Sequence, residues 1–235
     1  MDKAECRIKL LKKFYNSRKL RFNELAEDVP SNFLSYHLKK FLDEGLIEKD
    51  GDFYVILPKG VEALAYSNKS DSTALKQPIH DVFLFPFKDG KYLFQRRKKI
   101  PFMGILMPIG SKITSGMSIF ETAERKLFRD SGLMGDLKFK GIIDVKTFRD
   151  GELFLHHVLN VFRIAELEGV LKENCDKGEN VFLGVDDYLK EENIMSGFKE
   201  QLAVAECENF MYLELKQFME GDKFSRVEIV RKVEF

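Results

Sequence analysis

Hydrophobic residues in the first 66 positions recur with the helical period in four stretches and with a strand-like pattern in two. The helical stretches span about residues 4–16, 23–26, 32–44 and 58–65. The strand-like runs, residues 46–49 and 53–56, flank Asp50-Gly51-Asp52, which is typical of a tight hairpin turn. The pattern therefore predicts a small unit of three helices, a hairpin and a further helix.

A polar, serine-rich stretch at residues 69–80 predicts a linker between a first domain, residues 1–68, and a second domain, residues 81–235. The second domain opens with two apolar runs around Lys88-Asp89-Gly90, which is another hairpin signal. The later pattern predicts two long strands at about residues 137–148 and 153–164 and a short strand at 181–183. A mostly helical segment is predicted at about 195–219, and a last strand at 224–235. Both halves are expected to mix strands and helices, which places the chain in the α+β class.

A helix from about residue 118 to residue 131 has clear start and stop signals. Ser118 is a good N-cap residue, and Glu121, three positions later, completes a capping box. Gly132 provides a left-handed C-cap. Three apolar residues at helical spacing are expected to face a core: Phe120, Ala123 and Leu127.

The loop and helix over residues 110–133 resemble the Nudix box. The family pattern is a Gly, five residues, a Glu, seven residues, Arg-Glu, an aliphatic residue, any residue, Glu-Glu, any residue, Gly and an aliphatic residue. The matching positions in an ungapped alignment are Arg125, Leu127, Gly132 and Leu133. The departures are Ser111 for the first Gly, Met117 for the first Glu, Lys126 for the next Glu, and Arg129 and Asp130 for the Glu pair. The resemblance implies a Nudix-type α/β/α sandwich over about residues 81–220, with a degenerate box.

In the Nudix family, carboxylates on one face of the box helix bind magnesium and a diphosphate. Here that face carries Lys126, Arg129 and Asp130. A hard divalent ion needs oxygen ligands, which an ammonium and a guanidinium group cannot supply. We therefore expect that the fold is kept, that neither a metal nor another cofactor is bound, and that the chain is not an enzyme.

The alternative to this expectation is a hydrolase with a displaced metal site, acting on a nucleoside diphosphate derivative. In that case Asp130 would act together with carboxylates from later loops. The candidates are Glu173, Glu179 and Asp186.

Cations in and near the box form a candidate ligand site. They are Arg96, Arg97, Lys112, Arg125, Lys126 and Arg129. If the fold is kept, they could meet the oxygens of a phosphorylated effector directly, with Arg as a bidentate fork and Lys as a point charge. The other interpretation is an ordinary solvated surface. In the family the box Arg pairs with a box Glu, and Arg125 lacks that partner here.

The first domain resembles arsenical-repressor-type winged helix-turn-helix domains over about residues 4–66. The match is closest over residues 34–47, Leu-Ser-Tyr-His-Leu-Lys-Lys-Phe-Leu-Asp-Glu-Gly-Leu-Ile, which looks like their recognition helix. The resemblance implies that the outer face of this helix enters the major groove of double-stranded DNA. The candidate DNA-binding residues are Asn32, Ser35, Tyr36, His37, Lys39, Lys40 and, in the wing, Lys49. His37 is interpreted as a packing or phosphate-contact residue.

Charge and composition restrict these interpretations. Lys and Arg total 38 and so do Asp and Glu, so no global field favours nucleic acid or a membrane surface. Through residue 68 there are 12 Lys and Arg against 11 Asp and Glu, which keeps protein docking open as the use of the first domain. No apolar run approaches the ~20 residues of a membrane span. The 3 cysteines are far apart, which is typical of reduced thiols in the cytoplasm.

Three functions fit these patterns. The favoured one is a cytoplasmic transcription regulator whose catalytically inactive Nudix-like domain senses a ligand or mediates dimerisation, because a DNA-binding domain joined to a sensor-type fold is typical of prokaryotic one-component regulators. The others are the displaced-site hydrolase and a module in which both domains dock proteins. For the regulator we expect a homodimer, formed through the 195–219 helix, the 224–235 strand or the first helix of the chain. We expect no membrane partner.

Overall fold

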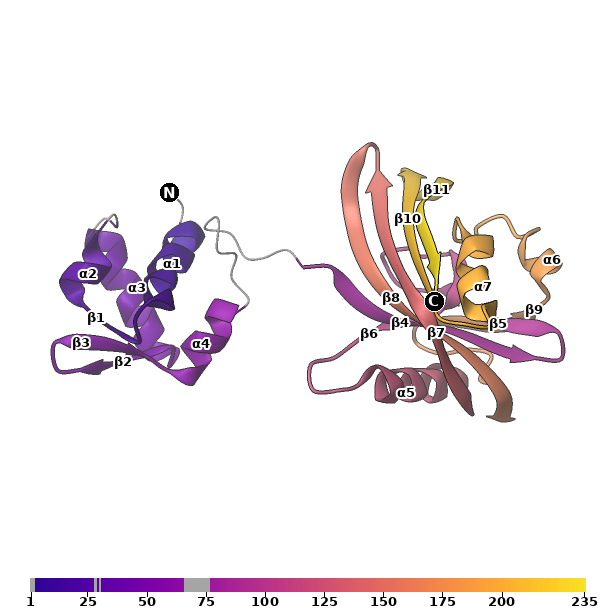
Figure 1. Cartoon of the computed structure of the whole chain (residues 1–235), viewed down its shortest axis with the longest axis horizontal. Coiled ribbons are helices and arrows are strands. Elements are labelled where there is room, and N and C mark those ends of the chain that lie inside the picture. Colours follow the sequence, from indigo (N-terminus) through magenta and orange to yellow (C-terminus); the bar gives the residue numbers. More distant parts are fainter. Residues whose placement is uncertain (1–2, 28, 30, 66–76) are drawn as a thin grey trace. The chain divides into compact units, whose positions relative to one another are not determined.

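The computed structural model describes residues 3–27, 29, 31–65 and 77–235. The chain divides into two compact units, Met1–Gln77 and Pro78–Phe235. Figure 1 colours the first unit in indigo and purple and the second from magenta to yellow. None of the helices in the described residues combines the length and the apolar character that a membrane span requires.

The first unit combines helices with a small antiparallel sheet of strand order β1-β3-β2 (Figure 1). Its helices are α1 (Lys3–Lys12), followed by a 3-10 turn η1 (Lys13–Tyr15), α2 (Phe22–Ala26), α3 (Ser31–Asp43) and α4 (Pro58–Ala65). Its strands are β1 (Lys19–Arg21), β2 (Ile47–Asp50) and β3 (Phe53–Ile56). The predicted helices and hairpin are present, and β1 is an addition to them. Leu10, Leu25, Leu34 and Phe41 are fully buried and form the centre of the core.

The second unit is built on an eight-stranded mixed sheet of order β11-β10-β7-β8-β4-β6-β5-β9. The strands are β4 (Ile79–Lys88), β5 (Lys91–Arg97), β6 (Leu106–Lys112), β7 (Leu133–Arg149), β8 (Glu152–Gly169), β9 (Gly178–Leu183), β10 (Met211–Glu220) and β11 (Lys223–Glu234). β4 runs parallel to β8 and β10 runs parallel to β7, while the other neighbouring pairs are antiparallel.

Helices cover both sides of this sheet. α5 (Ile119–Ser131) lies on one side, and α6 (Val185–Tyr188) and α7 (Phe198–Glu206) lie on the other (Figure 1). The alternation of side chains along β4 explains the two layers. Val82 and Leu84 pack with the α5 side chains, whereas Phe83 and Phe85 belong to a second, Phe-rich core with the α6 and α7 side chains.

Two turns follow their sequence signals closely. Asp89 and Gly90 join β4 to β5 with φ of 50° and 76°, and Asp150 and Gly151 join β7 to β8 with φ of 52° and 88°. Positive φ at both central residues is what a tight hairpin turn of the primed type requires, and an Asp-Gly pair tolerates it. The hairpin predicted at Lys88-Asp89-Gly90 is confirmed, and the two long strands predicted after the box form a second hairpin, β7 and β8.

Three predictions are wrong in whole or in part. Residues 195–219 are not mostly helical, because only α7 is helical there and β10 begins at Met211. Met211, Leu213, Leu215 and Met219 are buried at alternate positions, the period of a strand rather than of a helix. Phe120 packs edge-on against the buried Phe162, as a core-facing residue does, but it is 44% exposed and is not enclosed as Ala123 and Leu127 are. Finally, β4 begins at Ile79, so the last two residues of the predicted linker belong to the sheet; residues 69–76 of that linker lie outside the described residues.

Candidate functional site

The helix α5 begins and ends as predicted, and its caps are local. The Ser118 hydroxyl accepts a hydrogen bond from the Glu121 amide at 3.1 Å, and the Glu121 carboxylate accepts one from the Ser118 amide at 2.8 Å. At the other end Gly132 has φ 74°, and its amide donates to the Phe128 carbonyl at 2.8 Å. These caps fix the helix on the sheet, and with it the side chains of positions 126, 129 and 130.

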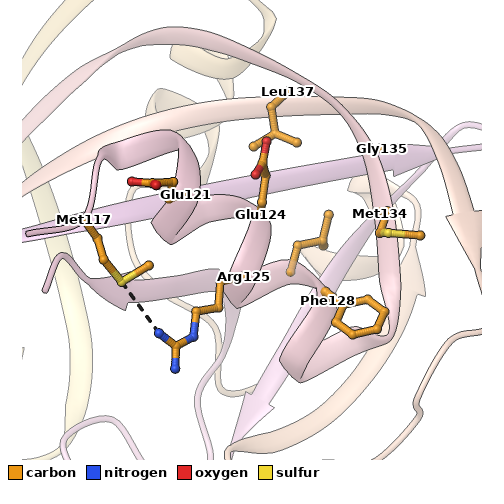
Figure 2. Close-up of a pocket in the computed structure, with 9 residues that line it drawn as sticks. Met117, Glu121, Glu124, Arg125, Phe128, Met134, Gly135 and Leu137 are labelled. Atoms are coloured by element: carbon orange, nitrogen blue, oxygen red, sulfur yellow. Dashed lines mark hydrogen bonds between the residues drawn. The ribbon is translucent and has the colours of Figure 1, made fainter.

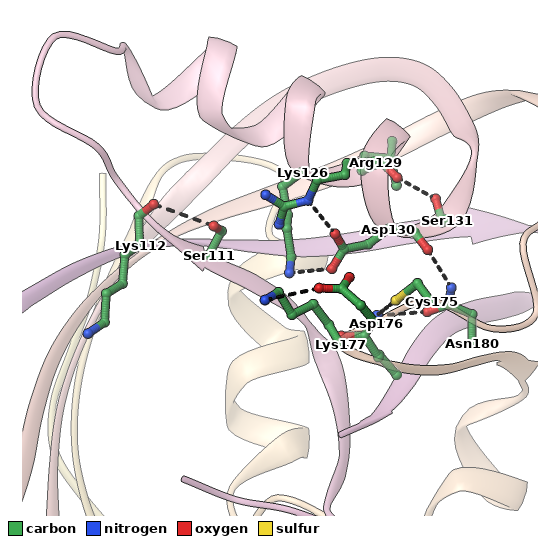
Figure 3. Close-up of polar contacts among 12 residues, drawn as sticks. Ser111, Lys112, Lys126, Arg129, Asp130, Ser131, Cys175, Asp176, Lys177 and Asn180 are labelled. Carbon is green, nitrogen blue, oxygen red and sulfur yellow. Dashed lines mark hydrogen bonds and ion pairs between the residues drawn. The ribbon is translucent and has the colours of Figure 1, made fainter. Parts of the chain in front are cut away.

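The box positions 126, 129 and 130 form one compact ion cluster (Figure 3). The Lys126 ammonium donates to Asp130 Oδ2, and Arg129 Nε donates to Asp130 Oδ1 at 2.8 Å. The Asp130 side chain is 0% exposed and that of Lys126 is 6% exposed, whereas that of Arg129 is 50% exposed. Both carboxylate oxygens are therefore bound by cations of the same helix, and Arg129 alone of the three is directed partly to solvent.

Burial and charge act in opposite directions on the pKa values of this cluster. Burial by itself would raise the pKa of the Asp130 carboxyl, but the hydrogen bonds and charges of Lys126 and Arg129 outweigh it and hold that pKa below its ordinary value. Burial also lowers the pKa of the Lys126 ammonium, the bond to Asp130 opposes this, and the positive charges of Arg129 and Arg97 lower the pKa further. The side chain of Arg97 therefore belongs to the same electrostatic neighbourhood.

Two buried amides hold the cluster against the sheet. Asn180 on β9 donates to the Asp130 carbonyl at 2.8 Å and to the Lys172 carbonyl at 2.7 Å. Gln95 on β5 donates to the Asn180 side-chain oxygen at 3.0 Å. Neither residue was predicted from the sequence. Their signal was a polar amide inside an otherwise apolar strand, where it needs hydrogen-bond partners.

The other predicted ligand cations lie in three different places. Arg96 pairs with Glu191 at 2.6 Å and donates to the Gly104 carbonyl, and Arg97 Nε donates to the Pro101 carbonyl at 3.1 Å. Arg96, Arg97 and Lys98 line a small cavity of about 240 Å³ at the end of β5. Lys112 is exposed on β6.

Arg125 does not join the other cations. It lies in an open groove of about 590 Å³ between α5 and the start of β7, where its guanidinium contacts Met117 Sδ at 3.7 Å (Figure 2). Phe128 and Met134 line the same groove and are 52% and 54% exposed. The six predicted cations therefore do not form one pocket: Lys126, Arg129 and Arg97 are neighbours, Arg96 lines the adjoining cavity, and Lys112 and Arg125 stand apart.

The carboxylates of the displaced-site alternative are also divided. Glu173, Glu179 and Glu191 line a second cavity of about 580 Å³ beside β9, which also includes Arg96 and Asn180. Glu179 and Glu191 are paired with Lys98 and Arg96. Asp186 lies on α6 and does not line this cavity. Among the described residues, no group of three or more His, Cys, Asp and Glu side chains is arranged to hold a metal ion.

In the first unit, most candidate DNA-binding side chains are exposed. Ser35, Tyr36, Lys39 and Lys40 are exposed on α3, and Lys49 is exposed on β2. Of the two interpretations of His37, the structure fits packing and not a phosphate contact, because this side chain is 3% exposed and packs edge-on against Tyr36 and near Phe41. A side chain buried to that extent cannot reach a duplex. The side chain of Asn32 lies outside the described part of the structure.

Comparison with known proteins identifies the fold of the second unit. No protein-family model and no curated protein matches the sequence. Among solved structures, a MutT protein from Bacillus halodurans matches with a TM-score of 0.52 and 18% identity, over 65% of this chain and 97% of that one. The second unit has the Nudix fold.

Two further solved structures match with lower scores. A MutT Nudix hydrolase from Burkholderia pseudomallei has a TM-score of 0.47 and 18% identity, over 54% of this chain and 97% of that one. The Nudix domain of Shewanella oneidensis NrtR, solved with ADP ribose, has a TM-score of 0.46 and 19% identity, over 60% of this chain and 95% of that one.

The expectation that the chain is not an enzyme is corrected by these matches. The finding that overturns it is the fold itself, which the second unit shares with a MutT protein. The expectation rested on the replaced carboxylates of the box, and those replacements concern the ligands of one ion. Fold and reaction are separate properties, and the replaced ligands do not decide whether the unit has an activity.

Proposed function

We propose that the second unit binds a phosphorylated small molecule and that the first unit binds double-stranded DNA, so that the chain acts as a regulator of transcription. The observation that carries the first part is the cationic cavity at the end of β5, beside the ion cluster of α5. Arg96, Arg97 and Lys98 line this cavity, and Arg97 shares an electrostatic neighbourhood with Lys126 and Arg129.

The cations of this cavity are available to a ligand at low energetic cost. The Arg96–Glu191 pair has both side chains 36% exposed, and the Lys98–Glu179 pair has them 45% and 55% exposed. Ion pairs this exposed contribute only about 0–1 kcal/mol each. A phosphate group, with more oxygens and more charge than a carboxylate, can displace Glu191 and bind Arg96 in a bidentate manner. The adjoining cavity of about 580 Å³ is large enough for the rest of a small organic molecule.

The second part of the proposal rests on the exposed face of α3 and on the hairpin beside it. Lys39 and Lys40 project from α3. On the hairpin side, two cations of β1 lie over the ring of Phe53 on β3. Lys19 Nζ is 4.8 Å and Arg21 Cζ is 5.0 Å from the ring centre. The element order, with a recognition-type helix followed by a two-stranded wing, supports a winged helix-turn-helix that places α3 in a major groove.

DNA binding is tested by fluorescence anisotropy of a labelled mixed-sequence duplex over a series of salt concentrations. A homodimeric regulator should bind more tightly at low salt, and Lys39→Ala/Lys40→Ala should reduce the slope of log K against log salt by about 0.9 for each phosphate that is no longer neutralised. Lys190→Ala, which removes an exposed lysine of the second unit, is the matched control and should leave the slope unchanged. Equal slopes for the two variants would refute DNA binding through α3.

Hydrolysis of the bound molecule is the second candidate function. It is favoured by the Nudix fold of the unit and by the presence of Glu173 and Glu179 in the cavity next to the cations. Turnover of nucleoside diphosphate derivatives, measured by release of phosphate-containing products, would support it if Glu173→Gln or Glu179→Gln lowers the rate while binding is kept. Binding with no turnover in the unmodified chain would leave the regulatory function.

A further inference from the structure

The Nudix fold implies a divalent metal ion at the box helix, and the residues of this chain do not fit one. Asp130 is the one carboxylate at the three box positions 126, 129 and 130, and its two oxygens accept hydrogen bonds from Lys126 and Arg129. A magnesium ion requires several oxygen ligands in near-octahedral geometry. An ammonium and a guanidinium group supply none, and they repel a cation.

The position of Lys126 suggests what replaces the ion. Its side chain is 6% exposed, and the ammonium lies against the fully buried Asp130 carboxylate, one helical turn along α5 (Figure 3). A buried carboxylate without a counter-charge is strongly unfavourable, so this position needs a cation whatever its source. Lys126 provides one that is covalently attached to the same helix and cannot dissociate.

The surroundings of Asp130 are adapted to this internal cation. Arg129 Nε, on the solvent side, donates a hydrogen bond to the second carboxylate oxygen, Asp130 Oδ1, at 2.8 Å. On the inner side Asn180 binds the Asp130 carbonyl, and Gln95 in turn orients Asn180. The carboxylate oxygens, the neighbouring carbonyl and the supporting amide all have partners within the protein, so the cluster is complete without an added ion.

We propose that Lys126 is a built-in substitute for the divalent ion, which makes both the fold of the box and the binding of a phosphorylated ligand independent of metal. The ligand would be met by Arg129 and the β5 cations directly, instead of through a metal bridge. This inference rests on the site proposed above, but its first test concerns the metal alone and needs no ligand.

The test compares thermal unfolding and Mn²⁺ binding of the full chain with those of its variants. For the unmodified chain, the unfolding midpoint should be the same with Mg²⁺, with Mn²⁺ and with a chelator, and titration with Mn²⁺ should show no bound ion by electron paramagnetic resonance. Lys126→Glu/Arg129→Glu restores three adjacent carboxylates at positions 126, 129 and 130. This variant should bind Mn²⁺ and gain on the order of 5 °C in its midpoint when the ion is saturating.

Two further variants keep the test decisive. Lys199→Glu/Lys232→Glu makes the same change of charge at exposed positions of α7 and β11 in the same unit and should not acquire Mn²⁺ binding. Lys126→Met removes the ammonium and adds no negative charge; it should lower the midpoint even if the double Glu variant does not fold. Stoichiometric Mn²⁺ binding by the unmodified chain that is abolished in Asp130→Asn would overturn the proposal. A Lys126→Met midpoint equal to that of the unmodified chain would overturn it as well.

Failure of this inference can be told apart from failure of the proposed function. If the unmodified chain binds Mn²⁺, and binds a phosphorylated compound only when the ion is present, the proposed ligand site stands and the proposal that Lys126 replaces the ion is wrong. If it binds neither Mn²⁺ nor inorganic pyrophosphate, the proposal that Lys126 replaces the ion stands and the proposed ligand site is wrong.

Discussion

Replacing Asp130 with asparagine tests how strongly the buried ion cluster holds the second unit together. The substitution keeps the shape of the side chain but leaves the ammonium of Lys126, whose side chain is 6% exposed, with no counter-charge at position 130. Breaking a buried pair by removing one partner costs about 3–5 kcal/mol. Arg129 contributes little to this cost, because its side chain is 50% exposed and water can solvate it.

This cost should be visible as a lower unfolding midpoint of the second unit. For a domain of this size, 1 kcal/mol changes the midpoint by roughly 2–4 °C, so the expected decrease is roughly 6–20 °C. Differential scanning calorimetry of the full chain measures it. The matched control is Asp187→Asn, which breaks the Lys190–Asp187 pair, whose side chains are 75% and 64% exposed. An exposed pair is expected to contribute less than about 1 kcal/mol.

Two results would contradict this expectation. Equal midpoints for Asp130→Asn and Asp187→Asn would mean that the buried cluster contributes no more than a surface pair. The double variant Lys126→Met/Asp130→Leu provides the second check, because replacing both partners with apolar side chains removes the unpaired charge. Its midpoint should lie above that of Asp130→Asn; a still lower midpoint would show that packing, not charge, determines the effect.

Three further predictions concern the same helix. The pKa of Asp130 is lower in the folded protein than the ~3.9 of an unfolded chain, so the Asp130 carboxylate contributes stability above about pH 4, and this contribution is lost as the pH falls. The stability of Asp130→Asn should therefore depend less on pH in acid unfolding followed by circular dichroism. Gly132→Ala should destabilise the protein more than Gly116→Ala in urea unfolding. Both glycines have positive φ, but a Cβ at Gly132 would lie 2.5 Å from the Val170 carbonyl oxygen, whereas a Cβ at Gly116 would meet nothing within 4 Å. The reverse order of stabilities would contradict the close approach of Gly132 to the Val170 backbone. Ser118→Ala should cost about 0.5–2 kcal/mol in the same assay through loss of the N-cap, and no change would contradict the capping box.

The parts of the fold that sequence predicts well are those set by neighbours in the chain. Ser118, Glu121 and Gly132 define the ends of α5 through bonds within a few residues, and the Asp-Gly turns depend on two residues each. The β10 strand was missed although its buried residues alternate, because the segment before it, α7, is helical and the two periods overlap within one apolar stretch.

The candidate site was predicted less completely because its geometry is tertiary. The sequence placed Lys126, Arg129 and Asp130 on one helix face, but it could not show that Lys126 would be buried and bound to Asp130 instead of exposed to a ligand. Gln95 and Asn180 are separated from Asp130 by 35 and 50 residues (130 − 95 and 180 − 130). The pairing of β5 with β9 places Gln95 opposite Asn180, and the packing of α5 on the sheet brings the Asp130 carbonyl to Asn180. Arg125 was grouped with the other cations by sequence and lies in the groove beside β7 instead.

The phosphate site proposed for the second unit is tested by isothermal titration calorimetry of the full chain against ADP-ribose and inorganic pyrophosphate, with a chelator present. We expect heat of binding for at least one of them, and affinity at least about tenfold weaker for Arg96→Gln/Arg129→Gln, a loss of about 1.4 kcal/mol that is typical of one charge-assisted hydrogen bond. The Lys232→Gln control, at an exposed lysine of β11 on the opposite edge of the sheet from β9, should bind as the unmodified chain does. Binding that is unchanged in the double Gln variant, or no heat with either compound, would contradict a phosphate site built from these cations.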